Sequence, residues 1–303
     1  MTADCLSRRQ RCRGVASFLA FFCACSIGQS ICIAASDTEA EAASAAIPWQ
    51  EGPCNGDLGG YASIKVPKGH LFTGRDGAPK FLELSHNPPD PTTVGILINV
   101  EGDDGWVVFF NYADIGHVPD DEKGKIDAAE ILANLKEGTE ASNIERRKRG
   151  WEEMHITDWI IPPGYEADTN RLAWGVGLSW AGGTGSNYDV RLLGRTGVMS
   201  ATLSCKPEAM TSLVTTLKTL LAGFEYNAGN KYGEWRAGDK VAAYGLTGLI
   251  TGAAAVAAAK SGLLAKIGVA LAKMGKAIII GIAVIGAGVW KLLFGNKTNA
   301  TLR

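Results

Sequence analysis

The chain has 303 residues, of which 46% are hydrophobic and 20% are charged, and its formal net charge is -1 at pH 7. This balance excludes a general affinity for nucleic acid, because binding to the phosphate backbone requires an excess of Lys and Arg. The length is sufficient for one well-packed domain together with segments that lie outside it.

Residues 1–35 are typical of a secretory signal peptide. Four arginines between positions 8 and 13 precede an apolar run, which ends in small residues at Ala34 and Ala35. This order of basic, apolar and small segments predicts export, with cleavage near the small residues. An uncleaved signal anchor is the alternative interpretation.

Only Cys54 and Cys205 of the seven cysteines follow the signal segment. Thiols that reach an oxidising compartment can pair, so we expect these two to be close together or bonded. A simple buried thiol at Cys205 is the alternative. The four histidines are scattered without ligand spacing, and no metal or cofactor is predicted.

Residues 36–50, rich in Ala, Glu and Ser, are expected to form a flexible tether. An acidic exported domain is predicted to follow over residues 51–236. Its expected elements, in chain order, are strands at 61–66 and 80–84, a hairpin of 94–100 with 106–112, a helix from about 120 to 148, strands at 154–161, 171–180, 188–193 and 198–204, and a helix at 207–222. The hairpin is expected to turn at Asp104-Gly105. Pro162-Pro163 is expected to end the strand at 154–161. Together these elements predict an α+β domain with a largely antiparallel sheet and two packed helices.

The C-terminal part of the sequence indicates a membrane anchor. No acidic residue follows Asp239, and residues 277–290 contain no charge. Lys276 and Lys291 bracket this stretch and can snorkel to the interface, and the apolar residues 292–294 extend it. We therefore expect a membrane-proximal helical segment at 237–276, a transmembrane helix at 277–294 and a short basic tail at 295–303.

Within the membrane-proximal segment, residues 260–276 have the spacing of an amphipathic helix that lies on the bilayer, with lysines suited to anionic lipid. The same apolar positions keep heptad spacing, so homo-oligomer formation through the C-terminal helices is the competing use. A hairpin of two spans that begins at residue 242 is the competing topology.

Four long runs of the sequence carry a family resemblance: GHVPDDEKGKIDAAEILANLKEGTEASNIERRKRGW (116–151), DWIIPPGYEADTNRLAWGV (158–176), NYDVRLLGRTGVMSATLS (187–204) and GDKVAAYGLTGLITGAAA (238–255). They resemble the family catalogued as domain of unknown function 2167. The resemblance implies an exported, membrane-anchored protein of the bacterial envelope. It implies no reaction, substrate or catalytic residue.

A candidate binding site comes from aromatic, amide and guanidinium side chains near the segments 171–180 and 187–193. If these segments pair as a hairpin, the groups can meet at one end of the sheet, where Arg supplies a bidentate donor and the rings supply rigid contact area. The predicted site residues are Tyr165, Asn170, Asn187, Tyr188, Arg191 and Arg195. The alternative is that these side chains pack in the core or hydrogen-bond to the backbone of the turns.

The sequence thus predicts a single-pass protein of the bacterial cell membrane, with its main domain in the periplasm. That domain is expected to bind or scaffold a partner, either an envelope protein, a peptide or a glycan, while the tail contacts membrane lipid. The alternative is an envelope hydrolase that uses a carboxylate near Asp158 or Glu166, with Arg191 or Arg195 as its electrostatic partner.

The single-pass topology has a direct test. A reporter fused after Arg303 should report a cytoplasmic C-terminus, because one span follows an exported domain. A reporter that is active outside the cytoplasm would eliminate the single-pass arrangement and leave the hairpin of two spans.

Overall fold

The computed structural model describes residues 44–100, 105–121 and 126–251. The predicted signal peptide, the predicted amphipathic helix and the predicted span at 277–294 lie outside these residues. Within the described residues, no helix is both long enough and apolar enough to cross a bilayer.

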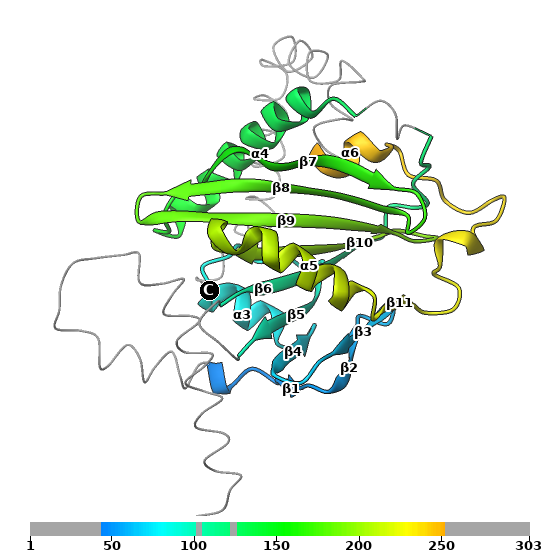
Figure 1. The fold of residues 1–303 in the computed structure, drawn as a ribbon, viewed down its shortest axis with the longest axis horizontal. Helices are drawn as coiled ribbons and strands as arrows, with labels where there is room; N and C mark the ends of the chain where they lie inside the picture. Colours follow the sequence, from blue (N-terminus) through cyan, green and yellow to red (C-terminus); the bar gives the residue numbers. More distant parts are fainter. Residues whose placement is uncertain (1–43, 101–104, 122–125, 252–303) are drawn as a thin grey trace, which may run out of the picture. The chain divides into compact units, whose positions relative to one another are not determined.

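An eight-stranded sheet forms the centre of the fold, and every neighbouring pair in it is antiparallel (Figure 1). In spatial order its strands are β1 (Gln50–Glu51), β4 (His70–Gly74), β5 (Thr93–Asn99), β6 (Val107–Ala113), β10 (Val198–Cys205), β9 (Gly183–Leu193), β8 (Arg171–Trp180) and β7 (His155–Glu166). The predicted α+β architecture with a large antiparallel sheet is therefore confirmed.

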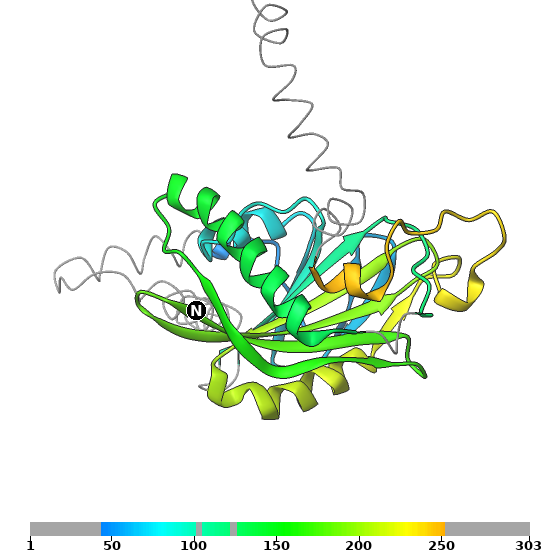
Figure 2. The same ribbon diagram turned by 90° about the horizontal axis from the view of Figure 1, so that it is seen from above.

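Different elements cover the two faces of this sheet (Figure 2). One face packs against α5 (Met210–Leu221), preceded by a 3-10 turn (Pro207–Ala209), and against a small sheet in the order β11-β3-β2. Its strands are β2 (Cys54–Leu58), β3 (Ala62–Val66) and β11 (Phe224–Tyr226). The other face carries α3 (Ala78–Leu84), α4 (Ala128–Lys148) and α6 (Leu246–Thr251). A second 3-10 turn spans Tyr232–Glu234.

The hydrophobic core differs between the two faces. On the α5 side, one continuous cluster joins the large sheet, the small sheet and the helix, through residues such as Ile64, Met199 and Leu217. On the opposite side the buried apolar residues form two separate clusters, one under α4 and α6 and the other under α3. The middle strands of the sheet lie between these two clusters.

Helix α4 begins later than the sequence pattern predicts. Asp127 caps it, and its Oδ1 accepts hydrogen bonds from the backbone N–H groups of Ala129 and Glu130 at 2.9 and 3.1 Å. Acids at positions 120 and 121 suggested an earlier start, but a side chain that satisfies two free N–H groups sets the first turn here. At its other end, Arg146, Arg147 and Lys148 place positive charge at the negative end of the helix dipole, which stabilises the helix.

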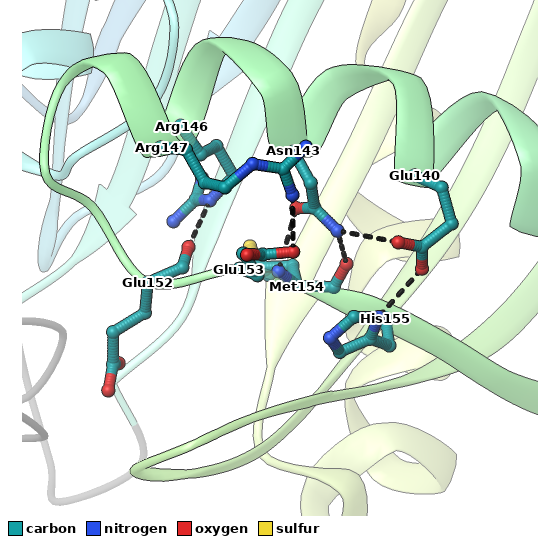
Figure 3. A network of polar contacts seen from close by, with 8 residues as sticks. All are labelled: Glu140, Asn143, Arg146, Arg147, Glu152, Glu153, Met154 and His155. Atoms are coloured by element: carbon teal, nitrogen blue, oxygen red, sulfur yellow. Dashed lines mark hydrogen bonds and ion pairs between the residues drawn. The ribbon is translucent and has the colours of Figure 1, made fainter.

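Asn143 attaches the C-terminal half of α4 to the chain that enters β7 (Figure 3). Its fully buried carboxamide donates to the backbone oxygen of Met154 at 2.8 Å and accepts from the backbone N–H of the same residue at 2.9 Å. Three residues later, Arg146 donates to the backbone oxygens of Glu152 and His86. The second of these bonds ties α4 to the loop that follows α3.

Two predicted elements are wrong in type or extent. Residues 80–84, predicted as a strand, belong to α3, because Pro79 favours a first helical turn and the buried Ala78, Phe81 and Leu82 have helical spacing. The strand predicted to end before Pro162 instead runs through both prolines as β7. An edge strand tolerates proline, since β7 pairs only with β8 and does so with shifts of register.

The Asn143 contact predicts a measurable loss of stability. Asn143→Ala should lower the free energy of unfolding by about 2 kcal/mol, because it leaves a backbone donor and acceptor without partners. Chemical denaturation followed by near-ultraviolet circular dichroism would measure this loss. The control is Ile144→Ala at the next position, whose side chain is 51% exposed. An equal change in the two variants would contradict the structural role of Asn143.

Candidate binding site

Six polar side chains occupy the middle of the sheet, on the face that carries α3 and α4. They come from alternate positions of two neighbouring strands: Asn187, Asp189 and Arg191 on β9, and Ser204, Thr202 and Ser200 on β10. They pair across the strands in that order. We call these six residues the polar strip. All are partly exposed, so the strip reaches solvent.

The alternation of a β-strand places these groups on one face. Tyr188, Val190 and Leu192 lie between the polar residues of β9 and are buried in the α5-side core. The polar residues therefore point to the opposite side. Trp174 on β8 and Phe109 on β6 flank the strip at the same level, and each packs in a different apolar cluster. The strip thus separates the α4 cluster from the α3 cluster.

Arg191 and Asp189 form the charged centre of the strip. Arg191 Nη1 lies 3.2 Å from Asp189 Oδ1, and Thr202 Oγ1 donates to the same oxygen at 2.7 Å. The Arg191 guanidinium lies 4.7 Å from the centre of the Trp174 ring. The side chains of Arg191 and Asp189 are 18% and 14% exposed, so solvent screens this pair less than it screens a surface pair.

Asn187 carries a polar atom for which the structure provides no partner. Its Oδ1 is buried, and no described residue donates a hydrogen bond to it. A buried acceptor without a partner costs free energy, and such atoms are rare in folded proteins. Because the oxygen is buried, a ligand N–H at the strip would satisfy it once the Asn187 carboxamide turns toward the ligand.

The predicted site residues divide among several environments. Asn187 and Arg191 share the polar strip. Tyr165 and Asn170 meet at the turn between β7 and β8, where the Tyr165 hydroxyl lies 3.5 Å from Asn170 Oδ1 and donates to Asp120 Oδ2 at 3.3 Å. Asn170 has a φ of 49°, a left-handed conformation that Asn tolerates in turns.

Tyr188 and Arg195 lie apart from the strip. Tyr188 is 4% exposed and belongs to the core on the opposite face. Arg195 forms a bidentate pair with Asp239, with Nε and Nη2 at 2.8 and 2.9 Å from the two carboxylate oxygens. The structure thus places Tyr188 in the core and Arg195 in an ion pair with Asp239.

The acids of the hydrolase alternative have other partners. Asp158 accepts a hydrogen bond from the backbone N–H of Trp159, and Glu166 pairs with Lys218 at 3.1 Å. The Lys218 contact lowers the pKa of Glu166, whereas a general acid requires a raised one. Arg191 and Arg195 pair with Asp189 and Asp239 instead. This geometry gives the hydrolase alternative no support.

The sequence interpretation missed four members of the strip: Asp189, Ser200, Thr202 and Ser204. A signal was present, because polar and apolar residues alternate over 187–192 in β9 and over 199–205 in β10. Pairing the two predicted strands in register, and then reading across them, would have placed the six side chains on one face.

The two cysteine thiols are unbonded in the structure. Cys205 is buried and lies 3.4 Å from Ser186 Oγ, while Cys54 is partly buried against the same α5-side core. Burial raises the pKa of both thiols, which keeps them protonated. A bond between Cys54 and Cys205 stays a prediction. Among the residues described, no cluster of His, Cys, Asp or Glu has the makeup of a metal site.

The fold and the strip define an α+β domain that is built on one large antiparallel sheet and has a polar face between two helices. The family described as "Protein of unknown function (DUF2167)" matches residues 50–286. The chain therefore belongs to this family, which confirms the resemblance seen in the sequence.

A comparison with curated proteins gives no match. Among solved structures, the chain is similar to the solution structure of cyanobacterial PsbP (CyanoP) from Synechocystis sp. PCC 6803. The identity is 10% and the TM-score is 0.34, and the similarity covers 59% of this chain and 91% of that chain.

The Arg195–Asp239 pair predicts an unusual titration. The Arg195 side chain, helped by the backbone N–H of Arg236, lowers the pKa of Asp239 from 3.8 to about 2. Because the folded-state pKa is depressed, the stabilisation is complete above the ordinary value and is lost as the pH falls through about 2. Carboxyl-carbon NMR should show this low midpoint, and Arg195→Gln should return it toward 3.8. A midpoint that stays the same in the variant would contradict the assignment.

Proposed function

We propose that this protein is a membrane-anchored component of the bacterial envelope whose exported domain binds an extended peptide segment of a partner on the polar strip. The observation that carries the proposal is the unpaired Asn187 Oδ1, two residues from the Arg191–Asp189 pair on a partly exposed face. The domain acts as a binding or scaffolding module in this proposal, with no reaction of its own.

The dimensions of the strip suit an extended chain. Successive polar residues on each strand are two positions apart, so the rows repeat about every 6.6 to 6.8 Å. An extended peptide repeats its side chains at the same interval. Three rows thus offer a matching surface to a peptide of about five residues.

The chemistry of the strip also suits peptide groups. The three hydroxyls of β10 and the Asn187 carboxamide can bond to backbone N–H and C=O groups. Arg191 can add a bidentate bond to a carboxylate. A glycan is a less suitable ligand, because sugars stack on exposed aromatic rings, whereas Trp174 is 2% exposed and has the Arg191 guanidinium beside its ring.

The membrane anchor in this proposal is the segment at 277–294, and the export signal is residues 1–35. Both rest on the sequence pattern. An anchored domain meets its partner at a surface, where the effective concentration of each is raised. A modest affinity at the strip is then sufficient.

Peptide binding can be measured on the full-length protein in detergent. An array of short unstructured peptides selects the best ligand, and calorimetry with that peptide gives the affinity. Arg191→Ala and Asn187→Ala should each weaken binding by about tenfold, the equivalent of about 1.4 kcal/mol. The control is Arg147→Ala, because Arg147 is 52% exposed and bonds Glu153 at the C-terminal end of α4, away from the strip.

Thermal melts separate this role from a structural one. Asn187→Ala should melt within a few degrees of the parent, because the removed oxygen has no partner among the described residues. Peptide binding that survives both strip variants would place the site elsewhere. Binding of glycan fragments in place of peptides, lost in Arg191→Ala, would keep the strip and overturn the ligand class.

A further inference from the structure

The segment that leads from β11 to α6 presents an unusual surface. Trp235 and Val241 are 42% and 50% exposed, although both side chains are large and apolar. We propose that residues 235–243, here named the Trp235 loop, contact the surface of an anionic lipid bilayer. This inference rests on the proposed membrane anchor and adds a lipid-facing side to the folded domain.

His117 brings the two exposed apolar residues to one place. The Trp235 ring lies 5.2 Å from the His117 ring. Val241 forms a parallel bridge with His117, in which His117 N–H donates to the Lys240 oxygen and Ala242 N–H donates to the His117 oxygen, both at 2.8 Å. Two exposed residues that are separated in the sequence thus form one patch.

The acidic and basic side chains of the segment differ in exposure: the acids bond to neighbouring groups of the fold, whereas the basic side chains are exposed. Asp239 is turned inward, where Arg195 and the backbone N–H of Arg236 bind its carboxylate. Glu234 accepts a hydrogen bond from the backbone N–H of Lys231. Arg236 and Lys240 remain exposed. The outer side of the loop is therefore apolar and cationic, which suits anionic headgroups.

Neighbouring segments also contribute acids near the loop. Lys240 Nζ donates to the backbone oxygen of Asp114 at 2.9 Å, and the Asp114 side chain is exposed. The carboxylate of Asp120 accepts a hydrogen bond from the Tyr165 hydroxyl. These acids offset part of the positive charge, so the apolar pair must supply part of the attraction to the bilayer.

The loop is ordered before it meets lipid. The Tyr232 ring stacks on His117 with centroids 4.4 Å apart, and its hydroxyl donates to the Val118 oxygen at 3.0 Å. Binding then costs little conformational entropy. Trp is the side chain favoured at the headgroup level, because its ring is apolar and its N–H is polar.

The position of the loop in the chain favours lipid over a protein as its occupant. From Lys240 onward the sequence contains no acidic residue and leads to the predicted span at 277–294. A domain that the chain tethers to such an anchor meets the bilayer at high effective concentration.

Quenching of Trp235 by brominated lipid tests the inference on the full-length protein. The chain is reconstituted into vesicles of phosphatidylcholine alone, or of phosphatidylcholine and phosphatidylglycerol in equal parts, with or without brominated phosphatidylcholine. The emission of the parent minus that of Trp235→Phe isolates Trp235, because the other tryptophans are common to both. This difference should be largely lost in brominated anionic vesicles. It should be lost to a smaller extent without phosphatidylglycerol, or when Arg236 and Lys240 are both changed to Gln.

Flotation of the same vesicles after an alkaline wash reports the anchor independently. If the protein floats and bromination leaves the Trp235 emission unchanged, the loop does not contact lipid and this inference fails, while the anchor stands. If the protein does not float, the proposed anchor fails and the loop inference fails with it. A variant that melts like its parent shows that the change in quenching is local, as expected for a side chain that is 42% exposed.

Discussion

The two bonds between the Asn143 carboxamide and the backbone of Met154 set the arrangement of the sheet face that carries α3, α4 and the polar strip. They fix α4 beside β7, and Arg146 extends the attachment to His86 after α3. Both helices are thereby held over the outer strands of the same face. On the middle strands β9 and β10, Leu193 and Val198 pack in the α4 cluster, and the three rows of side chains beyond them on this face are polar. Removing Asn143 would therefore affect the polar strip as well as the stability of α4.

The two faces of the sheet meet different physical demands. On the α5 side, apolar residues from three layers exclude water, and Arg171, whose buried Nε has no partner in the described structure, donates from Nη2 to the Leu221 oxygen at the end of α5. On the other side, Arg191, Asp189 and Thr202 bond to one another, while Asn187 Oδ1 has no partner in the described structure. A fold tolerates such an atom only where something else compensates. The α5 side is closed by its core, whereas the strip is partly exposed, and this difference is the reason for placing the ligand on the strip.

Much of this fold follows from the sequence, since β8, β9, β10 and α5 show clear periodicity. The errors have local causes. The residues of α3 are too few for the pattern to separate helix from strand, and β7 accepts prolines because it has only one neighbour. The candidate site could be predicted in part. Asn187 and Arg191 are correctly on one face, but Tyr188 alternates with them and must face the other way. Arg195 meets Asp239 across 44 positions, a contact that no local pattern reveals.

The proposed peptide surface and the proposed lipid surface are joined by one short segment. Val241 belongs to the exposed side of the Trp235 loop. Three residues later, burial raises the pKa of Tyr244, and the charge of Arg191 opposes this rise to a smaller extent. The same segment then enters α6, which packs in the cluster that contains Trp174. A peptide that draws Arg191 away from Asp189 would change the charge that Tyr244 meets. Residues 241–246 therefore connect the two proposed surfaces along the chain.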